Sequence, residues 1–249
     1  MARPQRALVV FETQLNNRMI HKREVNPKWI NRRLSLYCDY TLPSLAAQTD
    51  RTCRICLGVR PETLDGIKRN KHLRSTLRRL GLLSRFSFST LPRLMDLRRE
   101  LAQSTPHDFY LFAHLDSDDM YHPLAAQEML GMAPFRGATG NGSEEQEVIR
   151  YVNGFFMDET TKRMRVWGSM LCPFYAQVWS RRYLLRRGCK RLRFHTTTRR
   201  AGLIRVISDA PRFVVLCHDA NHYTRYKHGE KELNAKQRAQ AARAFPFLT

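Results

Sequence analysis

The chain has 249 residues, 43% of them hydrophobic, so it can bury a sizeable core without disulfides or structural metal ions. This composition excludes a disordered chain, and because no Ser/Gly/Pro-rich linker divides it we expect one domain, residues 1–249. Lys and Arg number 43 against 22 Asp and Glu, a formal net charge of +21. The charge predicts an anionic partner, either a nucleic acid or a nucleotide diphosphate with an anionic lipid or saccharide.

Targeting signals and cysteine chemistry are weak in this sequence. The apolar run at residues 7–11 is too short for a signal-peptide core and is interrupted by Glu12. No segment approaches the roughly 18 to 20 apolar residues that cross a bilayer, so we expect a cytoplasmic protein. Cys53 and Cys56 have C-x-x-C spacing, but their segment is typical of a strand, which would point the two thiols to opposite faces. We therefore interpret them as core thiols instead of a zinc or redox pair.

The N-terminal part is typical of a β-α-β unit. Residues 8–11 and 55–59 are continuous apolar runs, as in parallel strands covered on both faces by helices. Between them lies a helical pattern from Trp29 that Pro43 interrupts and restarts. In that pattern Ile30, Leu34 and Tyr37 share one face, and Arg32, Arg33 and Asp39 lie elsewhere.

The next elements lead to an acidic cluster. Helices are expected at residues 62–83 and 92–103, with a short strand at 86–88 between them. Residues 109–115 form the most hydrophobic strand and run directly into Asp116-Ser117-Asp118-Asp119. The carboxylates are thus placed at the carboxyl end of a central strand, where open α/β sheets bind ligands.

The second half of the chain reads as antiparallel. The expected elements are a helix at 122–132, a loop at 137–147, strands at 149–156, 164–170 and 213–217, and a basic amphipathic helix at 230–245. The predicted fold class is α/β, with a Rossmann-like mixed sheet flanked by helices, a parallel N-terminal half and antiparallel C-terminal additions.

Carboxylates one residue apart at a strand end are hard oxygen ligands for Mg²⁺ or Mn²⁺ and leave coordination positions open for phosphate. Asp116, Asp118 and Asp119 are the candidate ligands, and a bound cation would act as a Lewis acid on a diphosphate leaving group. His218 is a further candidate because it follows the strand at 213–217. The alternative to metal binding is a structural role, in which Asp119 caps the helix expected at 122.

Four blocks in order resemble a family of bacterial rhamnosyltransferases with a GT-A fold, over about three quarters of the chain. The blocks are Arg32 through Asp50, with its Pro43-Ser44-Leu45 and Gln48-Thr49; His114-Leu115-Asp116-Ser117-Asp118-Asp119 with His122-Pro123; Asn153-Gly154-Phe155 with Asp158; and Val214 through Asn221. The sequence departs from the family pattern at His114, at Asp219, and at Val59-Arg60, where an acidic residue for the nucleobase is common.

The resemblance implies a metal-dependent glycosyltransferase of the hexosyltransferase type. It would transfer a sugar, rhamnose by family name, from a nucleotide-diphosphate donor to a saccharide or lipid-linked acceptor. Asp116 would face the donor ribose or a metal-bound water, Asp118 and Asp119 the metal, and His218 the metal or diphosphate. Thr13 and Arg98 are further candidates for donor contacts. The nucleotide-sugar half would cover about 1–120, the acceptor half about 121–229, and the basic helix about 230–245.

An inverting transfer also needs a base for the acceptor hydroxyl. Asp209 is the candidate because it lies late in the chain, where many GT-A enzymes place this group. His195 and Asp158 are the alternatives.

Two other functions stay open at this point. The charge of +21 and pairs such as Arg181-Arg182 and Arg199-Arg200 would suit a nucleic-acid-binding or nucleic-acid-processing protein, although no recognised nucleic-acid motif accompanies them. A phosphatase with an aspartyl nucleophile would want its aspartates after the first strand, whereas here they follow about the fourth. For a transferase, part of the basic surface, the C-terminal helix above all, would contact an anionic membrane.

Overall fold

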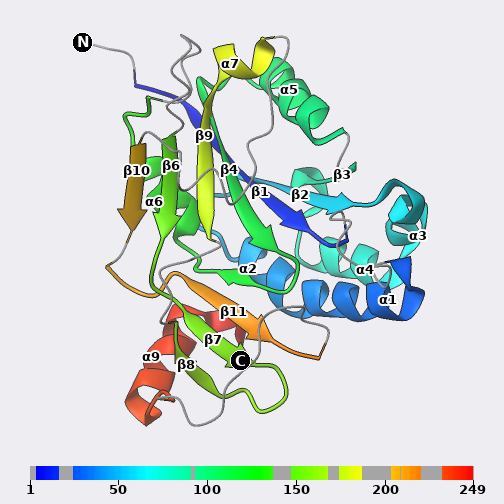
Figure 1. The fold of residues 1–249 in the computed structure, drawn as a ribbon, viewed down its shortest axis with the longest axis vertical. Helices are drawn as coiled ribbons and strands as arrows, with labels where there is room; N and C mark the ends of the chain where they lie inside the picture. Colours follow the sequence, from blue (N-terminus) through cyan, green and yellow to red (C-terminus); the bar gives the residue numbers. More distant parts are fainter. Residues whose placement is uncertain are drawn as a thin grey trace.

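A seven-stranded mixed sheet forms the centre of the protein. The computed structural model describes residues 4–16, 25–90, 93–136, 147–167, 174–186, 203–207, 209–219 and 232–248. The strand order is β10-β6-β9-β4-β1-β2-β3. Its parallel half consists of β1 (Ala7–Gln14), β2 (Arg54–Val59), β3 (Phe86–Thr90) and β4 (Phe109–Asp116). Figure 1 shows the strands fanning out between helices. The predicted α/β fold class is confirmed.

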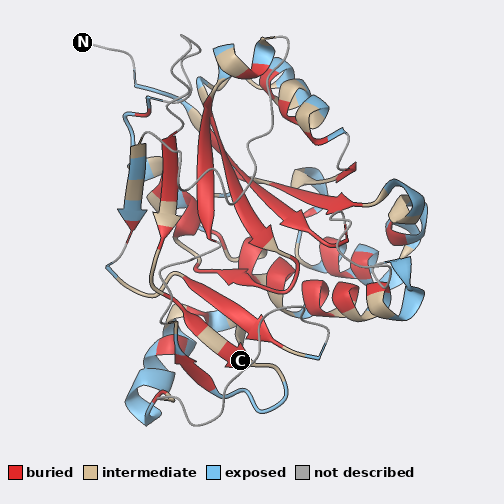
Figure 2. Ribbon diagram, in the orientation of Figure 1, coloured by how far each residue is buried: buried red, intermediate tan, exposed pale blue. Residues whose placement is uncertain are grey.

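The continuous apolar runs arise because helices cover both faces of the parallel half (Figure 2). Val9 and Phe11 of β1 face a core that includes residues of α1 (Pro27–Leu36), α4 (Lys71–Arg79) and α6 (Ala125–Gly131). Leu8 and Val10 face the opposite core, which includes residues of α5 (Leu94–Ser104) and α7 (Arg181–Leu185).

The two cysteines of the C-x-x-C spacing lie on these opposite faces. Cys53 belongs to the first core and Cys56 to the second. Burial raises the pKa of Cys53 to about 11 and that of Cys56 to about 12, so both thiols stay protonated at neutral pH. Their role as core thiols follows from this packing.

Three strands complete the main sheet, and two of them, at residues 175–180 and 203–207, were not predicted from the sequence. On the side of β4 away from β1, β9 (Tyr175–Ser180) pairs antiparallel with β4. β6 (Glu147–Tyr151) in turn pairs antiparallel with β9. At the far edge, β10 (Leu203–Ile207) runs parallel to β6, so the second half is not wholly antiparallel. β9 is buried along five of its six residues, but Gln177 interrupts the apolar run that would have marked it.

A second, four-stranded sheet lies below the main sheet in Figure 1. Its order is β5-β11-β7-β8, formed by Met120–Tyr121, Phe213–Cys217, Phe155–Asp158 and Met164–Val166. The expected single strand at 149–156 is wrong: its residues divide between β6 and β7, which belong to different sheets. The strand expected at 164–170 ends at Val166 within the described part of the chain, and residues 168–170 lie outside it.

Two expected helices also differ in detail. Residues 62–83 form α3 (Leu64–Arg69) and α4 instead of one helix, because Asn70 ends the first and its side chain accepts a hydrogen bond from Leu73 N–H in the second. After α1 the chain makes one π-type turn at Tyr37–Thr41 and continues as α2 (Leu42–Ala46), with Pro43 in its first turn. The helix expected at 122–132 begins only at Ala125, as α6.

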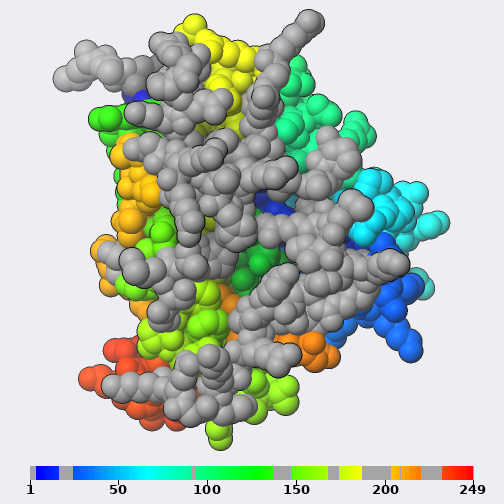
Figure 3. All heavy atoms as spheres, viewed as in Figure 1, coloured from blue at the N-terminus to red at the C-terminus, as the bar shows by residue number. Residues whose placement is uncertain are grey.

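The C-terminal helix α9 spans Ala235–Ala244, shorter than the expected 230–245, because Asn234 and Gln237 form a capping box at its start. Residues 230 and 231 lie outside the described part. Leu233, Ala241 and Phe245 pack against the second sheet. In Figure 3 the red residues of α9 form one corner of the molecule, beside the green residues of that sheet. Among the described residues, no helix is both long and apolar enough to cross a membrane.

We predict that Gly154→Ala lowers the free energy of unfolding by about 1–3 kcal/mol, because the new methyl group would overlap the Phe213 ring. That ring cannot move freely, since it stacks on Phe174 at 4.1 Å between centroids. The matched control is Gly66→Ala in α3, where a methyl group meets nothing within 4 Å and should stabilise by up to about 1 kcal/mol. Urea unfolding of both variants measures the difference, and equal stabilities would contradict this packing.

Candidate functional site

The acidic cluster lies where three strands of the two sheets end. β1 and β4 are parallel neighbours, so Gln14 at the end of β1 stands opposite Asp116 at the end of β4. β11 ends next to His218, whose Nε2 lies 2.7 Å from Oδ2 of Asp118. Residues 100 positions apart in the chain therefore meet at one edge, as the sequence predicted.

Arg33 joins this pair, contrary to the expectation that it lies away from the buried face of its helix. Its Nη1 donates to Asp118 Oδ2 at 2.5 Å, and its Nη2 donates to Asp118 Oδ1 at 2.9 Å and to Ser117 Oγ at 2.8 Å. The Arg33 side chain is 9% exposed and that of Asp118 6%. The result is a buried bidentate ion pair between α1 and the end of β4.

The signal for Arg33 was present in the sequence. Trp29, Arg33 and Tyr37 are spaced four residues apart and so share one side of the helix. The Arg33 guanidinium carbon lies 5.6 Å from the centre of the Trp29 ring. A long side chain on a partly apolar stripe can reach a strand end, so the separation of Arg33 from the apolar face of its helix was wrong.

Asp118 and Asp119 have opposite electrostatic environments. Burial alone would raise the pKa of Asp118, but the charge of Arg33 and the hydrogen bond from His218 hold it below its ordinary value. Burial, reinforced by the charges of Asp118 and Asp116, raises the pKa of Asp119 well above its ordinary value. The pKa of Asp118 is thus lowered, and that of its neighbour Asp119 is raised.

Asp119 is not a helix cap. The N-cap position of α6 is Leu124, and Oδ1 of Asp119 accepts a hydrogen bond from Leu216 N–H of β11 at 3.1 Å. The side chain therefore ties the loop after β4 to the second sheet, and the capping alternative is wrong.

Asp116 is the accessible member of the cluster. Its side chain is 43% exposed, and its Oδ1 lies 3.5 Å from Nε2 of His114. His114, where the family has a basic residue, is buried and stacks on Tyr175 at 5.4 Å between ring centroids. Of the three aspartates, Asp116 has the most exposed side chain, so it is the most accessible to a bound molecule.

The expected metal ligands are of suitable chemical type but are not arranged around a common point. Both oxygens of Asp118 face Arg33, and one also faces His218, while Asp119 Oδ1 faces a backbone N–H. In the described ranges, no group of three or more His, Cys, Asp or Glu side chains is placed to hold a metal ion. This arrangement does not fit a divalent cation bound by Asp116, Asp118, Asp119 and His218.

The other donor candidates lie in the core. Thr13 Oγ1 donates to Cys56 O at 3.1 Å and lies 3.1 Å from the Tyr37 hydroxyl, so this side chain is occupied inside the sheet. Arg98 is 3% exposed and donates from Nε to Glu12 Oε1 at 2.7 Å, below the Phe112 ring. Neither side chain joins the cluster of Arg33, Asp118 and His218.

Of the described candidates for a catalytic base, Asp209 lies away from the cluster and Asp158 lies near it. Asp209 is exposed and precedes β11, whereas His218 follows it. The two residues therefore lie at opposite ends of a strand about 16 Å long. Asp158 caps a turn, accepting from Thr161 N–H at 2.7 Å. It stands opposite Cys217 in the register of β7 and β11, next to His218 in the chain. His195 lies outside the described residues.

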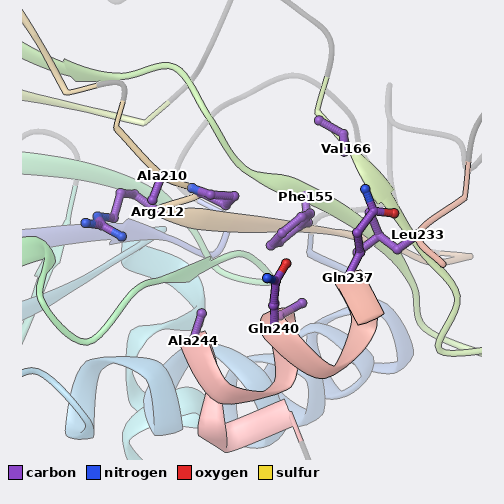
Figure 4. Close-up of a pocket in the computed structure, with 10 residues that line it drawn as sticks. Phe155, Val166, Ala210, Arg212, Leu233, Gln237, Gln240 and Ala244 are labelled. Carbon is purple, nitrogen blue, oxygen red and sulfur yellow. The ribbon is translucent and has the colours of Figure 1, made fainter. Parts of the chain in front are cut away.

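A separate cavity of about 380 Å³ opens between the second sheet and α9. Phe155 lies at its centre, and Gln237, Gln240 and Ala244 project from α9 (Figure 4). The lining residues are Phe155, Val166, Ala210, Pro211, Arg212, Leu233, Gln237, Gln240, Ala241 and Ala244. The Arg212 guanidinium turns away from Phe155 and is bound by Glu128 at 2.7 Å. The cavity contains no member of the acidic cluster.

Comparisons with known proteins give only distant structural similarity. No protein-family model matches the chain. No curated protein sequence matches it either. One similar structure is the inositol-1-phosphate CTP transferase of T. maritima, with 11% identity, a TM-score of 0.40, and coverage of 84% of this chain and 88% of that one.

Two further structures are similar at the same level. A proposed nucleotide-diphospho-sugar transferase from Desulfovibrio desulfuricans G20 has 10% identity and a TM-score of 0.35, covering 84% of this chain and 82% of that one. A protein of Mycobacterium tuberculosis H37Rv has 15% identity and a TM-score of 0.33, covering 84% and 91%. Similarity this distant says nothing about the reaction that the protein catalyses.

We predict that His122 makes the free energy of unfolding decrease as the pH is lowered. Burial, with a contribution from the charge of Arg212, lowers its pKa from 6.5 to about 4, so the folded protein holds it neutral. The unfolded chain binds the proton more readily, and the stability that His122 contributes is therefore present above pH 6.5 and lost as the pH falls from 6.5 to about 4.

The loss is at most about 3 kcal/mol. His122→Asn removes the titrating group and keeps an acceptor for the Leu124 N–H that His122 Nδ1 now binds at 3.1 Å. Urea unfolding between pH 7 and pH 4 should show a smaller loss in the variant, after the common titration of other groups is subtracted. Parallel curves for the two proteins would contradict the assignment.

Proposed function

We propose that this protein is a glycosyltransferase that binds the diphosphate of a nucleotide-sugar donor at the edge formed by Arg33, Asp116, Asp118 and His218. The acceptor would be a saccharide or a lipid-linked saccharide. The donor sugar implied by the resemblance is rhamnose, and the transfer would be inverting.

One observation carries the proposal: three blocks of the resemblance meet in one buried contact. Arg33 comes from the first block, Asp118 from the second and His218 from the last, and all lie within hydrogen-bonding distance of one another. The third block adjoins them, since Asp158 pairs in register with Cys217. Blocks that matched only by chance would have no reason to converge when the chain folds.

The location also suits a phosphate-bearing ligand. Ligands of open α/β sheets bind outside the carboxyl ends of the strands, which is where Asp116 and the residues after it stand. The formal charge of +21 draws anions toward the whole molecule. In a sugar transfer, the diphosphate leaving group gains negative charge, and fixed positive donors at the site would stabilise it. The alternative of a nucleic-acid ligand rests on the charge alone.

We predict that a nucleoside diphosphate raises the melting temperature of the protein. The panel is UDP, GDP, CDP and dTDP, each with and without MnCl₂, with single-stranded DNA as the nucleic-acid arm. Asp116→Asn should weaken binding of the responsive nucleotide by about tenfold or more, because it removes the accessible carboxylate from the expected ribose contact.

Asp116 is a better test residue than Asp118, since replacing Asp118 would leave Arg33 as an unpaired buried charge and destabilise the protein directly. The control is Asp96→Asn on α5, an exposed carboxylate outside the cluster. A protein that binds DNA but none of the four nucleotides, or an Asp116→Asn variant that binds them as the wild type does, would refute the proposed site.

A further inference from the structure

The guanidinium of Arg33 stands in the place that the sequence assigned to a metal ion. It contacts two of the four side chains that were expected to bind that ion, with Nη1 at 2.5 Å from Asp118 Oδ2 and 3.3 Å from His218 Nε2. A divalent ion bound through Asp118 would have to compete with Arg33 for at least one of its two carboxylate oxygens. Breaking a buried, bidentate charge pair is costly, so such an ion would bind weakly here.

The guanidinium also retains a donor that the described residues leave unused. Arginine has five N–H groups. The four on Nη1 and Nη2 are directed at Asp118, Ser117 and His218. The fifth, on Nε, is buried and has no partner in the described part of the chain. A buried N–H without an acceptor is unfavourable, and an oxygen atom of a bound anion would satisfy it.

The surroundings hold this cation in a fixed orientation. Asp118 accepts hydrogen bonds from Nη1 and Nη2, and Ser117 accepts another from Nη2. The Trp29 ring lies 5.6 Å from the guanidinium carbon. A group fixed in this way loses little side-chain freedom when a phosphate binds. Asp118 then acts as a positioning residue for Arg33 and His218, and not as a metal ligand.

We infer that Arg33 is the built-in cation of this site, and that it binds the donor diphosphate without a divalent metal ion. The inference rests on the proposed function and narrows it. It assigns the diphosphate contact to Arg33 Nε–H and to His218, with Asp118 and Ser117 holding the guanidinium in place.

The test is calorimetric titration of the full chain with sodium pyrophosphate in the presence of EDTA, at about 0.15 M NaCl and again at about 0.5 M. The wild type should bind at one site without any metal. Arg33→Lys keeps the positive charge but loses the planar guanidinium, with its bidentate contact to Asp118 and its Nε donor. The substitution should weaken binding by about tenfold or more. The matched control is Arg205→Lys, which alters another arginine paired with a buried carboxylate, Glu147, and should bind as the wild type does.

A second variant guards against loss of folding. Arg33→Met with Asp118→Asn removes both charges of the pair together, so neither is left unpaired. Circular dichroism should show it folded, and pyrophosphate binding should be lost. If either folded Arg33 variant binds pyrophosphate as tightly as the wild type, the inference is overturned.

Three other outcomes are decisive. Binding that EDTA abolishes and Mn²⁺ restores would show that the cation is a divalent ion, which overturns the inference and leaves the proposed function standing. Binding that disappears equally from all variants at high salt would be non-specific attraction to the basic surface, and would also overturn it. Absence of binding by pyrophosphate and by all four nucleoside diphosphates, with or without Mn²⁺, would remove the proposed function itself.

Discussion

The buried pair of Arg33 and Asp118 is the interaction on which the site depends. Arg33 belongs to α1, Asp118 follows β4, and His218 follows β11 of the second sheet. The pair therefore links the first helix, the main sheet and the second sheet at one point. Because a buried charge without its partner is strongly destabilising, these three parts of the chain are forced into one arrangement. The same constraint that fixes the fold here also fixes the positions of the polar groups at the edge.

The fold could be predicted where packing decides the local pattern. β1 and β4 lie between two helical layers, so their first five residues, 7–11 and 109–113, are all apolar. The strands that escaped prediction are those for which position matters more than composition. β9 is central because it bridges β4 and β6, yet Gln177 interrupts its apolar run. Leu203–Ile207 at the edge alternates partly exposed and exposed residues, and its neighbour β6 decides that it is a strand.

The site shows the same division between local and non-local information. Asp116, Asp118 and Asp119 could be placed at a strand end because the chain itself carries the strand into them. That His218 reaches Asp118 could be anticipated only from the order of the elements. The role of Arg33 depends on a contact across 85 positions. The spacing of Trp29, Arg33 and Tyr37 indicates that the side chain can face the protein, but it does not show that the partner is the carboxylate of Asp118. Which aspartate stays accessible, Asp116, is likewise a property of the folded edge alone.

Unfavourable polar features collect at this edge, and a ligand would explain them together. Among the described residues, Nε of Arg33 is buried without an acceptor, and the side-chain oxygen of Gln14, opposite Asp116, is buried without a donor. Burial and the charges of Asp118 and Asp116 raise the pKa of Asp119. Each feature costs stability that an apolar substitute would not, and a polar site with unused donors and acceptors remains in a fold only if something else selects for it. An anionic ligand that accepts from Arg33 and donates through a ribose hydroxyl to nearby oxygens would satisfy both kinds of unused group at once. This is the chemistry of a nucleoside diphosphate, which carries phosphate oxygens and ribose hydroxyls in one molecule.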